Sequence, residues 1–240
     1  MNTALIKLKG IRKSYRLGKV DVVALRDVSL EIQAGEFVAL AGASGSGKTT
    51  LLNLIGCIDK PSAGSIQLDG VDVTGKSLPA LAGIRSRRIG FIFQTFNLLP
   101  VLSAFENVEY PLLFAGLGRS QRRKRVWQWL QHAGLRDQAR QRPDQLSGGQ
   151  RQRVAIARAM VTEPSLVLAD EPTANLDSGT AAQILDLMSQ INSETGTTFL
   201  FATHDPRITE RASRQIRLQD GQIAGYALTP EFHWRLANAH

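Results

Sequence analysis

The chain has almost no cysteine and no long apolar run. Its 240 residues include one cysteine, Cys57, which excludes an internal disulfide and the usual zinc clusters and favours a reducing compartment. No apolar stretch approaches the roughly 20 residues that cross a bilayer. The start of the chain also lacks the apolar region of a signal peptide. We therefore expect a soluble protein that reaches a membrane only through a partner.

Internal repeats and low-complexity tracts are missing too, and the composition is that of a folded domain. Hydrophobic residues make up 43% and charged residues 21%, which argues against a disordered or fibrous chain. The length suits one sizeable domain with an inserted subdomain.

The net charge of +8 comes largely from two basic runs, Arg85–Arg88 and Arg119–Arg125. Both are interpreted as solvated helix faces, with anionic lipid headgroups or nucleic acid as the other possible partners. Neither run is interleaved with aromatic residues, so we expect no nucleic-acid partner.

The hydropathy pattern predicts short strands in the first part of the chain, helices in the middle, and strands that alternate with helices in the last part. This order predicts a parallel α/β core with a helical insertion. A capping-box pattern from Ser103 to Glu106 opens the helical part, and Gly134 ends a helix in it whose apolar face carries Val126, Leu130 and Ala133. The other expected elements are strands at Phe37–Ala41, Ile66–Leu68, Ile89–Phe93, Leu166–Ala169 and Thr198–Ala202, helices at Lys48–Ile58 and around Ile184–Ile191, and a hairpin turn at Asp220–Gly221.

A glycine-rich loop follows the apolar strand at residues 37–41 and precedes a helix. It fits the phosphate-binding pattern G-x-x-x-x-G-K-[ST], whose backbone N–H groups and helix N-terminus face an anion. Lys48 would reach the β and γ phosphates, and the Thr49 hydroxyl would bind magnesium. The predicted nucleotide-binding residues here are Gly42, Ala43, Ser44, Gly45, Ser46, Gly47, Lys48, Thr49 and Thr50.

Two acidic residues end the apolar run Leu166–Ala169. A buried strand that ends in Asp170 and Glu171 puts carboxylates at the carboxyl edge of the sheet, beside the phosphate loop. Asp170 would hold magnesium, and Glu171 would orient or deprotonate the attacking water.

A second glycine-rich helix start lies at Leu146–Gln150, where Ser147 is expected to be the N-cap. Such a turn is also a second anion site. One chain then has two phosphate-binding helix ends for one nucleotide. A head-to-tail dimer accounts for this, with each ATP held by the phosphate loop of one chain and by Ser147, Gly148, Gly149 and Gln150 of the other.

From about Leu5 to Gly225 the sequence resembles the ABC ATPases. Their elements occur in order: the phosphate loop, a Q-loop at Gln94, the signature Leu146–Gln150, the two acids, a D-loop at Asn175–Asp177 and a switch histidine at His204. The resemblance implies a P-loop NTPase with a RecA-like core, an antiparallel β subdomain and an inserted helical subdomain. The implied boundaries are 1–93 and 161–227 for the core with its β subdomain, 94–160 for the helical subdomain and 228–240 for a tail.

The resemblance also implies residue roles, with ATP and Mg²⁺ as ligands. Tyr15 would stack on adenine, although a lone tyrosine is more often a packing residue. Gln94 would touch magnesium and sense a permease, Asp177 would help to join the dimer halves, and His204 would contact the γ-phosphate. The expected catalytic residues are Glu171, His204, Gln94 and Lys48, and the expected magnesium ligands are Thr49, Gln94 and Asp170.

The stretches 54–61, 89–100 and 171–177 resemble the lipoprotein-releasing and macrolide-export subfamily, LolD and MacB-like. This implies an ATPase subunit on the inner face of the inner membrane, powering export or extraction of lipoprotein, peptide or drug by a separately encoded permease. A regulatory ATPase of the cell-division type, FtsE-like, is the alternative. DNA-repair or translation ABC proteins usually carry a long insertion, zinc-binding cysteines or two ATPase domains, which this chain lacks.

Two further segments each have two interpretations. The apolar loop Phe96–Leu102 is placed by the resemblance in the groove that receives a permease helix, with core packing as the ordinary alternative. The tail at 228–240, with Phe232 and Trp234, is interpreted as either a docking segment or disordered.

Overall fold

The computed structural model describes residues 4–18 and 20–228. They form two compact units, Met1–Gly83 with Thr198–His240, and Ile84–Thr197. Each unit is described by itself. The last twelve residues, 229–240, lie outside the described residues, and so do Phe232 and Trp234.

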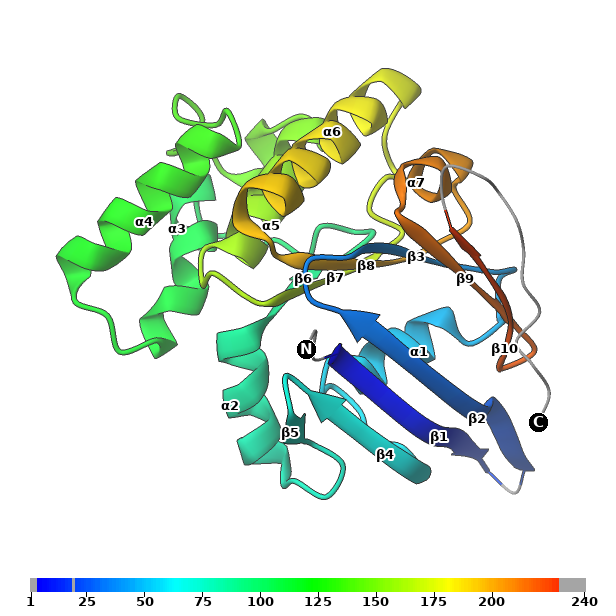
Figure 1. Cartoon of the computed structure of the whole chain (residues 1–240). Helices are drawn as coiled ribbons and strands as arrows, with labels where there is room; N and C mark the ends of the chain where they lie inside the picture. Colours follow the sequence, from blue (N-terminus) through cyan, green and yellow to red (C-terminus); the bar gives the residue numbers. More distant parts are fainter. Residues whose placement is uncertain (1–3, 19, 229–240) are drawn as a thin grey trace. The chain divides into compact units, whose positions relative to one another are not determined.

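An antiparallel sheet in the first unit has the strand order β2-β1-β4-β5 (Figure 1). Its strands are β1 (Ala4–Leu17), β2 (Val20–Gln33), β4 (Ala63–Leu68) and β5 (Val71–Asp72). One face of the sheet carries buried aliphatic side chains such as Ile6, Leu8, Leu30 and Ile32, as expected for a sheet with one face packed on a core.

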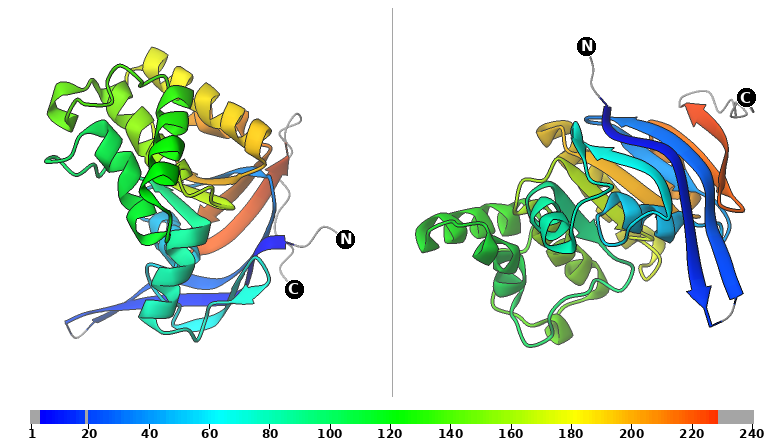
Figure 2. Two further views of the ribbon diagram at one scale, coloured as in Figure 1. Left: turned by 90° about the vertical axis from the view of Figure 1, so that its left-hand side faces the viewer. Right: turned by 90° about the horizontal axis from the view of Figure 1, so that it is seen from below.

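The short strands expected at the start of the chain are instead two strands of 14 residues each. They run side by side along their length (Figure 2). The register shifts between Leu8 and Ile11 and again around Lys13, and Gly10 and Asp27 have positive φ angles of 58° and 57°. These bulges interrupt the period-2 alternation, which is why the sequence pattern looks like shorter pieces.

The phosphate loop lies in the parallel part of the same unit. β3 (Phe37–Ala41) pairs in parallel with β8 (Thr198–Thr203) on one side and with β9 (Arg214–Gln219) on the other. β10 (Gln222–Leu228) pairs antiparallel to β9 through the predicted Asp220–Gly221 turn, whose φ angles are 49° and 76°. β3 and β8 are almost wholly buried, which explains their continuous apolar sequences.

The helix after the phosphate loop, α1 (Lys48–Ile55), is shorter than the predicted 48–58. Gly56 is its C-cap and Cys57 has a φ of 56°, so the chain leaves the helix there. The N–H groups of Ile58 and Asp59 then turn back to donate to Asn53 O, at 2.9 and 3.2 Å. A short helix, α7 (Pro206–Arg211), follows β8.

The second unit combines two parallel strands with helices. β6 (Ile89–Ile92) pairs in parallel with β7 (Leu166–Asp170). The helices are α3 (Ala104–Glu109), the 3-10 turns η1 (Tyr110–Phe114) and η2 (Pro143–Gln145), α4 (Arg119–His132), α5 (Gly148–Met160) and α6 (Ser178–Thr195).

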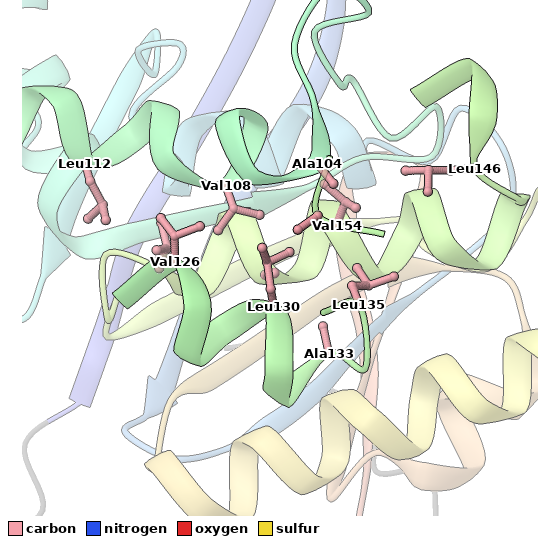
Figure 3. Close-up of a cluster of buried hydrophobic side chains, with 12 residues drawn as sticks. Ala104, Val108, Leu112, Val126, Leu130, Ala133, Leu135, Leu146 and Val154 are labelled. Carbon is pink, nitrogen blue, oxygen red and sulfur yellow. The ribbon is translucent and has the colours of Figure 1, made fainter. Parts of the chain in front are cut away.

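A cluster of buried aliphatic side chains holds α3, α4 and α5 together (Figure 3). The predicted face of Val126, Leu130 and Ala133 is part of it, and Gly134 ends α4 with a φ of 69°. The Ser103–Glu106 capping box is also present. The helical character begins only at Ala104, because residues 94–103 form a loop.

A further helix, α2 (Leu78–Arg88), was predicted only at its end, where the Arg85–Arg88 run was interpreted as a helix face. Leu81 is its one buried residue, so it has no apolar periodicity to detect. The Arg85–Arg88 run ends this helix, and the second basic run lies on α4, where Arg122 pairs with Glu109 and Arg125 with Glu163. Among residues 4–18 and 20–228, no helix has the length and apolar character of a membrane span.

Candidate functional site

The phosphate loop Gly42–Thr49 is held closely by two neighbouring strands. A Cβ on Gly42 would lie 2.2 Å from Leu218 O, and one on Gly47, with a φ of 104°, would lie 2.8 Å from Ala24 O. Gly221 N–H donates to Ser46 O at 3.0 Å. Only glycine fits at Gly42 and Gly47. The backbone of the loop is therefore held in place by the neighbouring strand residues Leu218 and Ala24.

The positive end of α1 points into this loop without a capping side chain. Of the described side chains, none caps the helix at Gly47, and its first turn contains no acidic residue. Lys48 is 8% exposed, and its Nζ donates to Gly42 O at 2.8 Å and Ala43 O at 3.0 Å. Ser46 Oγ is buried without a hydrogen-bond partner in the described part of the chain. An uncapped helix start, an ammonium group and an unpaired hydroxyl together suit an anion.

The exposed residues of the loop are Ala43, Ser44, Gly45 and Thr49, while Thr50 is half-buried. His204 reaches the same edge of the sheet. Because Ala41 pairs with Thr203, the residues that follow each strand, Gly42 and His204, leave the sheet together. His204 is exposed, and Asp205 after it caps α7 by accepting from Arg207 N–H at 2.9 Å.

Tyr15 lies on β1 and is 36% exposed. Its hydroxyl donates to Asp59 Oδ2 at 3.0 Å, and Lys13 Nζ lies 4.8 Å from the centre of its ring. The ring is therefore held at the surface by specific partners and is not packed in the core.

In the second unit, one strand pair brings the Q-loop and the acids to a common edge. Ile92 pairs with Ala169, so Gln94 follows one strand and Asp170 ends the other. Asn175 Nδ2 donates to Gln94 O at 2.9 Å, which ties the D-loop to the Q-loop. Gln94 is exposed and Asp170 is half-buried.

Glu171 has an unusual backbone conformation, with a φ of 46°. For a residue with a Cβ this left-handed region costs energy and is common at functional positions. The turn is supported by Ala174 N–H donating to Glu171 O at 3.2 Å, and by the fully buried Gln152, whose Nε2 donates to Pro172 O at 2.7 Å. α5 therefore buttresses the segment that carries Glu171.

The signature starts α5 as expected. Ser147 Oγ accepts from Gln150 N–H at 3.2 Å and Gln150 Oε1 accepts from Ser147 N–H at 2.9 Å, which confirms Ser147 as the N-cap. A Cβ on Gly149 would lie 2.5 Å from Thr180 Cγ2 and one on Gly148 would lie 3.4 Å from Leu176 Cδ2. Gly149 thus allows close approach of α6, and Gly148 allows close approach of the D-loop.

Asp177, the last residue of the D-loop, has a local structural task as well. It is the N-cap of α6, and its Oδ1 accepts from Thr180 N–H at 2.9 Å. Hydrogen bonds from the Thr180 side chain and backbone lower the pKa of Asp177. The carboxylate is exposed and ionised at neutral pH.

The loop Phe96–Leu102 is divided between core and surface. Leu98 packs against the buried cluster, whereas Leu99 is 38% and Val101 73% exposed. The buried Asn107 hydrogen-bonds to the backbone of this loop at Leu99 and Leu102. Arg158 of α5 also holds the loop by donating to Phe96 O and Asn97 O. Burial lowers the pKa of Arg158.

Sequence reasoning missed four supporting residues, Lys13, Asp59, Asn107 and Arg158. Asp59 lies in the stretch 54–61 but had no role assigned to it, and the other three lie in no motif. Most of the partners of these residues are distant in the chain, as with Lys13 and Asp59. A polar residue in an apolar helical stretch, as at Asn107, was the one available signal.

Known proteins match this chain over most of its length, and residues 25–174 match the ABC transporter family. The macrolide export ATP-binding/permease protein MacB of Syntrophobacter fumaroxidans is 51% identical over 91% of this chain and 31% of that protein. The uncharacterized ABC transporter ATP-binding protein YvrO of Bacillus subtilis is 47% identical over 91% of this chain and 95% of that protein. The chain thus spans about a third of MacB and nearly all of YvrO.

Among solved structures, the dimeric post-hydrolysis state of the ATP-binding cassette MJ0796, bound to ADP and Pi, is 44% identical. It superposes with a TM-score of 0.87 over 95% of this chain and 100% of that chain. The chain belongs to the ABC transporter family, as one of its ATPase cassettes. The predicted family, α/β P-loop fold class and MacB-like relationship are confirmed.

Proposed function

We propose that this chain binds ATP with magnesium and hydrolyses it to drive a separately encoded membrane permease that exports or extracts a lipoprotein, peptide or drug. The observation that carries the proposal is the phosphate loop of the first unit. It presents an uncapped helix start, the Lys48 ammonium and the buried Ser46 hydroxyl to one anion. The MacB relationship supports the transport role and the export direction.

In this proposal residues of the first unit contact the ATP. Residues Gly42–Thr50 bind the phosphates, Tyr15 stacks on the adenine, and His204 contacts the γ-phosphate. The β3–β8 register, which brings Gly42 and His204 to one edge, supports the last assignment. Lys48 stabilises negative charge on the transferred phosphoryl group.

Magnesium fits the residues assigned to it. The Thr49 hydroxyl, the Gln94 amide oxygen and the Asp170 carboxylate are hard oxygen donors, and Thr49 and Gln94 are exposed. Bound magnesium would neutralise charge on the phosphates. A single carboxylate in this set matches the way magnesium is usually held together with substrate phosphates.

Glu171 is the proposed general base, and the left-handed turn at this residue supports a constrained role. Its carboxylate would take the proton of the attacking water, with Gln152 and the α5 helix holding the turn in place.

The proposed partners are a second copy of this chain and a membrane permease. Ser147, Gly148, Gly149, Gln150 and Asp177 would face the nucleotide of the second copy, and the dimeric state of MJ0796 supports this arrangement. The exposed Leu99 and Val101 would meet the permease. The chain would then lie in the cytoplasm at the inner membrane, with residues 94–160 as its helical subdomain.

The test is Glu171→Gln, with Glu163→Gln as matched control. Glu163 is also a glutamate of positive φ, at 54°, in the same unit. We expect Glu171→Gln to lower kcat by roughly 100-fold or more, to keep ATP affinity, and to give a dimer on sizing in ATP. Glu163→Gln should keep full turnover. Near-normal turnover of Glu171→Gln would remove this residue as the base.

The regulatory ATPase of the cell-division type is the second candidate. Reconstitution with the permease encoded beside the chain separates the two functions. ATP-dependent movement of a cargo supports transport, whereas permease-stimulated ATPase without cargo movement supports regulation.

A further inference from the structure

Tyr15 is the centre of a small polar network on the first unit. Its hydroxyl donates to Asp59 Oδ2 at 3.0 Å, and Lys13 Nζ donates to Asp59 Oδ1 at 2.8 Å while lying 4.8 Å from the centre of the Tyr15 ring. Lys13 Nζ also donates to Lys60 O at 2.8 Å. The Lys13 side chain is 12% and the Asp59 side chain 32% exposed, so this ion pair is partly shielded from water.

Both oxygens of Asp59 are used. Oδ1 accepts from Lys13 and from Lys60 N–H, the latter at 2.7 Å, and Oδ2 accepts from Tyr15. Burial acts to raise the pKa of Asp59, but these hydrogen bonds outweigh it and lower the pKa. Burial and the Asp59 hydrogen bond raise the pKa of Tyr15. At neutral pH the phenol therefore donates to an ionised carboxylate, the stronger type of hydrogen bond.

The network connects β1 to the helix that starts at the phosphate loop. Asp59 lies just beyond α1, where its N–H is fixed to Asn53 O at 3.2 Å. The Thr50 side chain, in the first turn of α1, acts on the same hydroxyl and lowers the pKa of Tyr15, against burial and Asp59, which raise it. These contacts hold the ring at a fixed place relative to the phosphate loop. Without them it would be less constrained, because Tyr15 lies near the end of the β1–β2 pair.

We propose that Asp59, oriented by Lys13, is a positioning residue that holds the Tyr15 ring ready to stack on the nucleobase. This inference rests on the proposed function, in which Tyr15 stacks on adenine. With one face of the ring covered by the Lys13 ammonium, the exposed part of the ring receives the base. Prior immobilisation of the ring raises affinity because less side-chain freedom is lost on binding.

A purely structural role for Asp59 is the competing explanation. In that case its loss would loosen the end of α1 and weaken phosphate binding as well. Inorganic tripolyphosphate distinguishes the two roles, because it carries the charge of the ATP phosphates but no base.

The experiment measures Kd for MgATP and for magnesium tripolyphosphate, together with KM and kcat for MgATP. The variants are Asp59→Ala, Tyr15→Phe and their combination, with Asp72→Ala as the control carboxylate, which is on β5 and lies outside the network. We expect Asp59→Ala and Tyr15→Phe each to raise Kd and KM for MgATP about 3- to 10-fold at unchanged kcat, since one immobilised side chain is at stake. The double variant should equal the single ones, tripolyphosphate binding should not change, and Asp59→Asn should partly restore affinity.

Three results would overturn the inference: unchanged MgATP affinity in both single variants, equal weakening of MgATP and tripolyphosphate, or fully additive effects. Tyr15→Ala separates this failure from that of the base stack itself. If Tyr15→Ala weakens MgATP alone while Asp59→Ala and Tyr15→Phe do not, the stack stands and the positioning role is wrong. If Tyr15→Ala leaves MgATP binding intact, the proposed adenine contact fails and the positioning role fails with it. Should Asp59→Ala fold poorly, Tyr15→Phe alone decides the point.

Discussion

Replacing Asn107 by leucine should destabilise the loop that leads from the Q-loop into the helical region. Asn107 is 0% exposed. Its Oδ1 accepts from Leu99 N–H at 2.8 Å, and its Nδ2 donates to the carbonyls of Leu99, Leu102 and Ser103 at 3.1, 3.0 and 3.0 Å. Leucine has a similar volume, so the change removes hydrogen bonds and leaves no cavity.

The magnitude follows from which groups lose their partners. Leu99 O keeps the bond from Leu102 N–H, and Ser103 O keeps the bond from Asn107 N–H. Leu99 N–H and Leu102 O lose theirs. At about 1–3 kcal/mol for each unsatisfied group, with water reaching the partly exposed loop, the free energy of unfolding should fall by about 2–4 kcal/mol. For a chain of this size that lowers Tm by about 4–16 °C.

Thermal denaturation followed by circular dichroism measures the effect. Ser103→Ala is the matched control, because it removes the cap of the same helix and should cost about 1 kcal/mol. If Asn107→Leu melts at or above the temperature of Ser103→Ala, the four bonds of Asn107 do not stabilise the loop and the reasoning is wrong.

Two more substitutions test the phosphate loop and a close backbone contact. Lys48→Ala should raise Kd for a non-hydrolysable ATP analogue roughly tenfold or more, because a cation facing the phosphates is lost. Calorimetry measures this Kd, and Lys124→Ala, at an exposed position of α4, is the control that should leave it unchanged. Equal affinities of the two variants would contradict the role of Lys48. Gly90→Ala should lower the free energy of unfolding by about 1–3 kcal/mol, since its Cβ would lie 2.5 Å from Ala159 O. Gly75→Ala, whose Cβ would have no atom within 4 Å, should be nearly neutral in the same denaturation measurement.

The sequence predicted those features that follow local rules. The strand at Phe37–Ala41 and the hairpin turn at Asp220–Gly221 occur as expected, because continuous burial and positive φ angles each leave a compact signature. The full lengths of the bulged β1 and β2 and of the weakly apolar α2 were missed, because their residues do not keep the period that identifies a strand or a helix.

The motifs predicted the residues of the candidate site, but not the residues that hold them in place. Lys13 and Asp59 are 46 positions apart, so no pattern in the sequence joins them. The left-handed turn at Glu171 has no signature either, because glutamate is rare in that conformation and the buried Gln152 that supports the turn lies 20 positions before its partner Pro172. Such features depend on tertiary packing, which overrides local preference.

The exposed part of the loop Phe96–Leu102 is the last surface to test. Leu99 is 38% exposed, and its backbone N–H and carbonyl are both held by Asn107, so the side chain projects from a fixed support. A fixed, exposed leucine next to the Q-loop suits docking of an apolar partner segment. Leu99→Asp should therefore spare folding and the basal ATPase of the isolated chain.

The same variant should lose assembly with the permease, or stimulation by it, because an aspartate buried at the interface without a counter-charge costs several kcal/mol. Co-purification with the permease, alongside ATPase of the chain alone, measures both effects. Lys124→Asp is a suitable control, since it introduces the same side chain at an exposed position of α4. Unfolding of Leu99→Asp would favour core packing, and normal assembly with normal stimulation would show that Leu99 does not contact the permease. Loss of assembly with intact basal turnover is the result that supports docking. It would show that the Leu99 side chain acts at the surface, whereas Asn107, which holds the Leu99 backbone, acts in folding.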